Sequence, residues 1–415
     1  MKGKIIFPII LSAMLLTACR EQPSEVRTEQ TETTSQTVTA ASETEIEVPE
    51  TITTAVTTSE TAAETTTTAF ETQPPKIENI GENVTLDLQK IDLNDIIKKD
   101  VNVNRLFFIG DTAAVGPLNG DLEIYFLDLE SKTLKGKISP PDDWKLDWIY
   151  TYIEGSGDVL CKLEVYKFDA EINDYKYGTL VVYNDFSTEV IEDEPEKNLA
   201  IPVGSHNISD VTYNIYDADS GEILVEGFND AENYGISSKW FDYKFPIDND
   251  RFVYRTAGYE SLPSFGYYDF TAGKAVDFPD SRDFIPVGCH NGKIYAEASA
   301  WDGVCGGEMY TFDIETLEAE HFMSSPAELG QYDYTEYYMP PSGEYIVASH
   351  HDEDNENYKN SKNIIFILSP DSGEVLAKCE FYNKFYPYSF EFMDGGKFAA
   401  YSSETNEIVI FDLKI

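Results

Sequence analysis

One stretch of this chain combines histidines and carboxylates at a density that could bind a metal ion. It runs from Ser349 to Asn363 and includes His350, His351, Asp352, Asp354 and Glu356. Such ligands suit Ca²⁺ or a transition metal. The stretch lacks the mid-loop glycine of an EF-hand, so a solvated acidic loop is the preferred interpretation. Calcium is the alternative, and no other cofactor is predicted.

A second group of residues pairs aromatic rings with carboxylates in segments that separate apolar runs. Its members are Tyr175, Tyr259, Trp301 and Asp302, with Asp174 and Tyr177 beside the first. Exposed rings next to carboxylates suit the binding of carbohydrate or peptide. We therefore expect these residues, together with His350 and His351, to line one ligand-binding face. Trp301 could equally be a packed residue, and Trp144, Trp148 and Trp240 are expected in the interior.

Four cysteines follow Cys19, and their spacing does not match a zinc site. Cys289 and Cys305 could join neighbouring strands through a disulfide, with free thiols as the alternative. Cys161 and Cys379 lie in alternating apolar runs, where cysteine behaves as a small buried hydrophobe.

The sequence offers no catalytic constellation. It has no Gly-x-Ser-x-Gly elbow and only four arginines from residue 76 onward. The same region holds 64 acidic residues, so close carboxylate pairs for glycoside hydrolysis would arise by chance. No catalytic residue is predicted, and a binding protein is favoured over an enzyme.

Hairpins must position these residues, because one phrase recurs: an alternating apolar strand, an Asp-containing or Ser-containing turn, then a second alternating strand. The instances span 124–138, 180–191, 213–225, 266–278, 309–322, 365–379 and 408–415. A further turn precedes most of them, at 156–157, 248–249, 291–292, 342–343 and 395–396. Each unit therefore contains four strands.

The units repeat at a mean spacing of about 47 residues, near the length of a β-propeller blade. This pattern resembles the WD-repeat and quinoprotein-like propellers of bacteria, although the Gly-His and Trp-Asp pairs of true WD repeats are absent. The resemblance implies an all-β domain, a single propeller of seven blades. Six blades are the alternative, because few residues separate Gly204 from Asp217.

The two ends of the propeller region are complementary. The last hairpin stops at Ile415 without an outer strand, whereas the strand-like run from Asn83 to Ile91 has no blade of its own. Pairing the two would close the ring and cover the strand edges that an open propeller exposes. The sequence thus predicts closure by an N-terminal strand in the C-terminal blade.

The first 18 residues are typical of a secretory leader. Lys2 and Lys4 precede an apolar run from Ile5 to Leu16, which is shorter than the roughly 20 residues that a membrane-spanning helix needs. Leu16, Thr17, Ala18 and Cys19 resemble the lipobox of bacterial lipoproteins, which implies cleavage before Cys19 and lipid on its thiol. The alternative is an ordinary leader with a chance cysteine.

Residues 19–75 read as a disordered tether between the anchor and a propeller domain at 76–415. From Arg20 to Pro75 there are 18 threonines, no glycine and one aromatic residue, so little apolar surface could offset the entropy of ordering. Such a tether suggests a thick wall, hence a Gram-positive cell.

Charge restricts the partners. The formal net charge is −45 for the chain and −38 from residue 76 onward, which repels nucleic acid and anionic lipid headgroups. We expect an extracytoplasmic, membrane-anchored monomer that acts as a binding scaffold for a cell-surface or secreted protein, or for a glycan. The alternatives are a carbohydrate-active or lactone-active enzyme and a component of an envelope sensing or assembly complex.

Overall fold

The computed structural model describes most of the chain from residue 74 onward. The described ranges are 74–97, 105–116, 123–141, 143–146, 152–192, 195–209, 212–227, 239–258, 261–298, 307–324, 335–352, 362–382, 387–393, 395–402 and 405–415. The predicted leader and nearly all of the predicted tether lie outside them. Within these ranges, no helix is long and apolar enough to cross a membrane.

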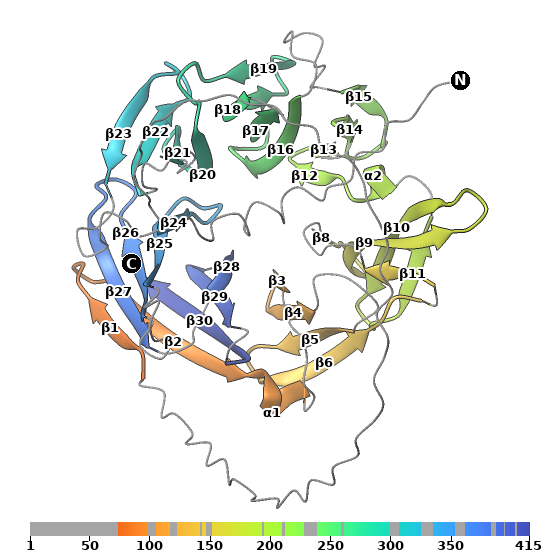
Figure 1. The fold of residues 1–415 in the computed structure, drawn as a ribbon, viewed down its shortest axis with the longest axis horizontal. Coiled ribbons are helices and arrows are strands. Elements are labelled where there is room, and N and C mark those ends of the chain that lie inside the picture. Colours follow the sequence, from red (N-terminus) through yellow and green to blue (C-terminus); the bar gives the residue numbers. More distant parts are fainter. Residues whose placement is uncertain are drawn as a thin grey trace, which may run out of the picture. The chain divides into compact units, whose positions relative to one another are not determined.

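Seven antiparallel sheets surround a central axis, so residues 76–415 form a seven-bladed β-propeller, as predicted (Figure 1). Blade 1 contains β3 (Arg105–Ile109), β4 (Thr112–Gly116), β5 (Ile124–Asp128) and β6 (Thr133–Ile138). Blade 2 contains β7 (Lys145–Leu146), β8 (Tyr152–Glu154), β9 (Val159–Asp169), β10 (Asp174–Tyr183) and β11 (Thr188–Ile191). Blade 3 contains β12 (Ile201–Val203), β13 (His206–Ile208), β14 (Ile215–Asp217) and β15 (Ile223–Val225).

The remaining blades follow the same order, in which the first strand lies nearest the axis (Figure 1). Blade 4 contains β16 (Lys239–Pro246), β17 (Arg251–Gly258), β18 (Ser261–Asp269) and β19 (Lys274–Asp277). Blade 5 contains β20 (Phe284–His290), β21 (Lys293–Ala298), β22 (Met309–Asp313) and β23 (Ala319–Met323). Blade 6 contains β24 (Thr335–Tyr338), β25 (Ile346–Asp352), β26 (Lys362–Leu368), β27 (Val375–Tyr382) and β1 (Lys76–Asn79). Blade 7 contains β28 (Pro387–Phe392), β29 (Lys397–Ser402), β30 (Glu407–Lys414) and β2 (Thr85–Asp92). Two short helices, α1 (Leu93–Ile97) and α2 (Pro195–Asn198), lie in the connections.

The recurring aspartate of the repeat stabilises the turn between the third and fourth strands. The carboxylates of Asp128, Asp217 and Asp313 accept hydrogen bonds from backbone N–H groups three residues later, at 2.7–2.9 Å. The same bonds hold the pKa of each of these carboxyls below its ordinary value. In these three hairpins the repeat signal therefore records a local turn stabilised by an aspartate side chain.

Blade 3 settles the blade count in favour of seven. Each of its four strands has only three residues, yet the register from Ile201↔Ile208 through Ile208↔Ile215 to Ile215↔Val225 is a complete antiparallel sheet. Because each strand has only three residues, the short interval from Gly204 to Asp217 can hold two strands and the loop between them.

The predicted closure is confirmed by the backbone register of blade 7. All eight residues of β2 pair antiparallel with β30, from Thr85↔Lys414 to Asp92↔Glu407. A second pairing was not predicted: β1 adds a fifth strand to blade 6, from Lys76↔Glu380 to Asn79↔Ala377. Asn79 links the two strands, because its side-chain Oδ1 accepts a hydrogen bond of 3.0 Å from the N–H of Leu86. The N-terminal segment thus joins two adjacent blades.

The core lies between neighbouring blades rather than at the axis. Trp144 is 7% exposed and packs with Cys161 between blades 1 and 2, as predicted for both residues. Cys379 is likewise fully buried, between blades 6 and 7. Burial raises the pKa of the Cys161 thiol to about 12, which fits a hydrophobic role. In blade 7, the rings of Phe398 and Phe411 stack with centroids 4.5 Å apart.

Leu86→Ala should destabilise the domain strongly, because Leu86 is 1% exposed and anchors the closing strand between blades 6 and 7. Removal of a buried leucine side chain costs about 2–5 kcal/mol. Urea unfolding of this variant should show a lower midpoint with an unchanged slope. Thr85→Ala, one residue away at an exposed position, is the control and should change the free energy of unfolding by less than about 0.5 kcal/mol. Equal midpoints for the two variants would contradict the closing role of β2.

Candidate functional site

The loop face is the side of the propeller that carries the loops between second and third strands and the blade-to-blade connections. Among the residues predicted to line it, Asp174, Tyr175 and Tyr177 lie there, in β10. His350 lies in β25 opposite Thr335 and is only 2% exposed, so it is part of the packed sheet. His351 and Asp352 also belong to β25, although their side chains lie outside the described part. The remaining predicted residues, Tyr259, Trp301, Asp302, Asp354 and Glu356, lie outside the described ranges.

An exposed row of aromatic rings marks the hairpin of β9 and β10, the longest strand pair described. Cross-strand register places Phe168 opposite Tyr175 and Tyr166 opposite Tyr177, so all four rings lie on one face of the hairpin. Phe168, Tyr175 and Tyr177 are 57%, 53% and 44% exposed. We call Tyr166, Phe168, Tyr175 and Tyr177 the aromatic ridge. Clustered exposure of large rings is uncommon on a soluble domain and typically marks an interaction site.

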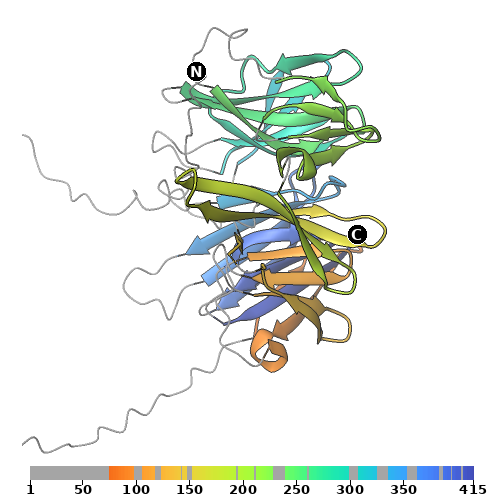
Figure 2. The same cartoon turned by 90° about the vertical axis from the view of Figure 1, so that its right-hand side faces the viewer.

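The hairpin extends past the rest of its blade. The outer strand β11 pairs only with Thr179–Val182 of β10, whereas β9 and β10 pair as far as Asp169↔Asp174. Figure 1 shows the two strands continuing beyond β11, and the hairpin, coloured yellow-green, can be followed from the side in Figure 2. Asn173 closes the tip at a φ of 53°, a conformation that asparagine tolerates. The ridge is therefore carried on a projecting two-stranded ribbon.

The opposite face of this hairpin is already satisfied within the protein. Lys167 and Lys176 lie directly across from each other, and Glu192 accepts a hydrogen bond from both ammonium groups. These two bonds lower the pKa of Glu192 to about 2. The Lys167 Nζ also lies 4.2 Å from the centre of the Trp144 ring. This face holds the hairpin against its blade and leaves the ridge pointing the other way.

A half-buried carboxylate lies near the loop face at the junction of three blades. Glu297 of β21 accepts a 3.4 Å hydrogen bond from the N–H of Tyr337 in blade 6. Burial, with repulsion from Glu336, raises the pKa of Glu297 to about 8, and the Tyr337 N–H and Arg255 of blade 4 oppose the rise only in part. The Arg255 Nε is itself buried and has no hydrogen-bond partner among the described residues. Glu297 can therefore carry a proton near neutral pH.

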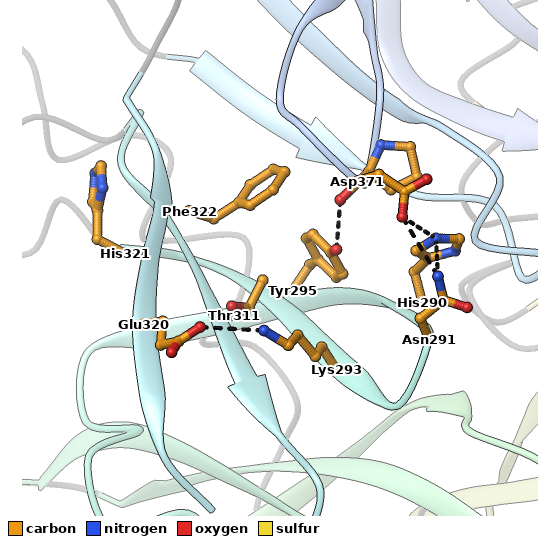
Figure 3. Close-up of a pocket in the computed structure, with 10 residues that line it drawn as sticks. His290, Asn291, Lys293, Tyr295, Thr311, Glu320, His321, Phe322 and Asp371 are labelled. Atoms are coloured by element: carbon orange, nitrogen blue, oxygen red, sulfur yellow. Dashed lines mark hydrogen bonds and ion pairs between the residues drawn. The ribbon is translucent and has the colours of Figure 1, made fainter.

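A hollow among the described residues lies on the opposite face, between blade 5 and the β26–β27 turn of blade 6 (Figure 3). His290 Nε2 and Asp371 Oδ1 are 3.2 Å apart, and Lys293 and Glu320 form an ion pair of 3.2 Å. The Tyr295 hydroxyl donates to the Pro370 carbonyl at 2.6 Å. Since these groups satisfy one another across the junction, we interpret the hollow as a structural contact between blades.

Metal binding and the disulfide stay predictions. Among the described residues, no three His, Cys, Asp or Glu side chains are grouped so that they could hold a metal ion. The acidic loop that could hold calcium lies largely outside those residues. Cys289 is a free, partly buried thiol in the structure, whereas its predicted partner Cys305 lies outside the described ranges.

Glu297→Gln should change how stability depends on pH. The pKa of Glu297 is higher in the folded chain than its ordinary value of 4.5, so the folded state keeps a proton that the unfolded state loses. This contribution is fully present below pH 4.5 and is lost as the pH rises toward 8, by up to about 1.4 kcal/mol per pH unit. Urea unfolding at several pH values should therefore show the variant gaining stability over the wild type as pH increases. The exposed Glu315→Gln is the control, and parallel curves for wild type and Glu297→Gln would refute the assignment.

No family model and no curated protein matches this chain. Solved structures with a similar backbone include the β-propeller domain of Cps50 (Swd1) from Myceliophthora thermophila, at 13% identity, 78% coverage of this chain, 99% of that one and a TM-score of 0.43. A member of the DUF4221 family from Bacteroides vulgatus has 10% identity, coverages of 81% and 98%, and a TM-score of 0.39. A puromycin hydrolase has 8% identity and a TM-score of 0.44; the match covers 75% of this chain and 51% of the hydrolase. At these identities the likeness concerns the propeller fold alone, and no activity is transferred from these proteins.

Proposed function

We propose that this protein is a lipid-anchored, extracytoplasmic binding scaffold that captures a protein or glycan on the aromatic ridge of its loop face. The exposure of Phe168, Tyr175 and Tyr177 on a projecting hairpin carries the proposal. Tyrosine and other large rings dominate binding energy at interfaces because they bury much area at a small entropic cost. The ridge needs no catalytic group for this role.

The anchor and tether explain why such a scaffold would carry a long N-terminal segment. Lipid on Cys19 would hold the chain at the outer surface of the cell membrane, and the Thr-rich tether would let the propeller reach through a thick wall of the Gram-positive type. A component of an envelope sensing or assembly complex would use the same arrangement.

An enzyme acting on a carbohydrate or lactone is the second candidate, and one observation favours it. The pKa of Glu297 is raised to about 8 by desolvation and by Glu336, and this favours near neutral pH the protonated form that a general acid requires. The binding scaffold would depend on the aromatic ridge and the enzyme on Glu297. Variants of these residues therefore distinguish the two functions.

Binding should depend on the ridge. Residues 20–415 would be screened on arrays of glycans and secreted proteins, with and without calcium, and each hit tested against Phe168→Ser with Tyr175→Ser. Loss of two exposed rings should weaken binding at least about tenfold without unfolding the domain. The matched control is Ile223→Ser with Leu224→Ser, which removes two side chains of 52% and 51% exposure from blade 3. Retained binding in the ridge variant would reject this surface, whereas turnover of a hit that stops in Glu297→Gln would establish the enzyme.

Cys19→Ser should abolish membrane attachment. Expression in a Gram-positive host with an alkyne-labelled fatty acid should label the wild-type chain but not the variant, because only the cysteine thiol can accept the lipid. The variant should appear in the culture medium or keep an uncleaved leader. Labelling of the variant, or equal release of both chains, would rule out Cys19 as the anchor.

A further inference from the structure

We infer that the outer edge of blade 6 is a docking site for an extended polypeptide segment of the pattern Lys–apolar–Glu, and that β1 occupies this site until a longer strand displaces it. The inference goes beyond the proposed function, because the site lies on β27 and does not involve the aromatic ridge. Three features carry it: the pairing of β1, the charges beneath β1, and the residues that end β1.

β1 is an addition to a blade that is already complete. The strands β24 to β27 give blade 6 the four strands of a propeller blade, and β1 pairs with the outer edge of β27 (Figure 1). Among the described residues, no strand pairs beyond the outermost strand of the other six blades. The fold itself therefore does not require β1. Without β1, the edge of β27 would offer its backbone N–H and C=O groups to an added strand.

The facing charges specify which strand fits this edge. Lys76 lies opposite Glu380. Two residues further along, Glu78 lies opposite Lys378. Because cross-strand partners point to the same face of a sheet, the four side chains alternate in sign on one face. An antiparallel strand of the pattern Lys–apolar–Glu meets attraction at both positions, whereas Glu–apolar–Lys would meet repulsion at both.

The two charges on β27 are buried, although β27 is the fourth strand of its blade. Lys378 and Glu380 are 7% and 5% exposed, and they form an ion pair of 2.9 Å. The Lys378 Nζ also lies 5.5 Å from the centre of the Phe366 ring. A buried charge that faces a like charge is strongly unfavourable, whereas exposed charges discriminate little. The edge of β27 should therefore exclude a strand whose charges are reversed.

β1 holds this site with few contacts. Ile77 is its one apolar side chain and is only partly buried against the core between blades 6 and 7. The side chains of Lys76 and Glu78, which form an ion pair with each other, are 56% and 42% exposed. β2, in contrast, pairs over eight residues and buries Leu86. Because segments with few buried contacts open at a lower free energy, β1 should detach while the ring stays closed.

Two prolines prevent β1 from using the whole edge. β27 has eight residues, and β1 pairs with four of them, 377–380. Continuing the register would set Pro75 opposite Phe381 and Pro74 opposite Tyr382, but proline has no N–H group to donate to a ladder. A partner strand without these prolines would gain two residue pairs that β1 cannot form.

The other end of β1 is limited by a turn. The N–H groups of Ile80 and Gly81 both donate to the carbonyl of Leu376, at 2.9 and 2.8 Å, and the chain leaves the edge there. A partner that continued straight would pair with Leu376 and Val375 as well. Its additional backbone hydrogen bonds would offset the loss of β1. The same prolines and turn would limit β1 of a second copy, so the observations favour a strand from another protein.

The test measures binding of fluorescein-labelled octapeptides to residues 20–415 by anisotropy. The probe, Thr-Val-Lys-Ile-Glu-Asn-Val-Thr, has the β1 pattern without the prolines, and the exchanged peptide has its lysine and glutamate interchanged. A third peptide has Pro-Pro as its first two residues. We expect the probe to bind, the exchanged peptide not to bind, and the Pro-Pro peptide to bind at least about fivefold more weakly than the probe.

Charge reversal in β1 tests displacement. Lys76→Glu with Glu78→Lys sets like charges across the two strands, so β1 should detach. The probe should then bind at least about tenfold more tightly than to the wild type, whose site is open in only a fraction of molecules. The control is Lys293→Glu with Glu320→Lys, which reverses an ion pair in blade 5 and should leave probe binding unchanged.

Charge reversal in both strands tests specificity. Adding Lys378→Glu with Glu380→Lys to the β1 reversal restores opposite charges across the strands, and this chain should prefer the exchanged peptide over the probe. Circular dichroism checks that each variant is folded. Should the fourfold variant not fold, the comparison of the two peptides on the β1 reversal still decides the outcome.

Absence of probe binding by the β1 reversal would overturn the inference, and so would equal binding of the probe and the exchanged peptide. Binding that disappears in Phe168→Ser with Tyr175→Ser would place the peptide on the aromatic ridge. That result would overturn the strand-docking site while the proposed function stood.

Discussion

The backbone pairing of β2 with β30 is the constraint on which the rest of the molecule depends. A propeller blade buries its faces against its neighbours, but a ring left open would expose two such faces and two strand edges. Eight consecutive residue pairs, from Thr85↔Lys414 to Asp92↔Glu407, remove that problem by building one sheet from both ends of the chain. The buried Leu86 and the partly buried Leu88 of β2 pack into the core between blades 6 and 7, so closure also completes a hydrophobic cluster. Pairing of β1 with β27 extends the same junction, and the Asn79 side chain bonded to Leu86 fixes the turn between the two strands.

Closure of the ring places the loops of all the blades around one axis. Each blade contributes its second-to-third loop to the same face, so residues distant in sequence are brought to one end of the axis. Glu297, Glu336 and Arg255 illustrate this, because they come from three blades and still act on one another electrostatically. The aromatic ridge, in contrast, is not assembled from several blades. It belongs to a single blade, and its rings face outward because the lysines on the opposite side are held by Glu192 and Trp144.

The fold could be predicted because its signals are local. Period-2 alternation and turn aspartates such as Asp128 and Asp217 mark each hairpin, and a short final unit pairs with an unassigned N-terminal run. The extra strand β1 was missed because its four residues, Lys76–Asn79, show no clear alternation, and their partner lies about 300 residues away. The candidate surface overlaps the predicted ligand-binding face only in part. Tyr175 and Tyr177 were predicted to lie on that face from their aromatic and acidic context, but Phe168 and Tyr166 become part of the same surface only through cross-strand register. Glu297 could not be selected among 64 acidic residues, because its raised pKa results from burial between blades, which no local pattern encodes.

Glu297 and the aromatic ridge, the two unusual features of the loop face, differ in how exposed their side chains are. Glu297 is half-buried and accepts a hydrogen bond from the Tyr337 N–H of blade 6, so its protonation is coupled first to the stability of the junction between blades. Phe168, Tyr175 and Tyr177 of the ridge are each more than two fifths exposed, and covering these rings would remove apolar surface from water at about 25 cal/mol per Å². Binding at the ridge would therefore bury apolar surface of a single hairpin and would not require the closed ring to open.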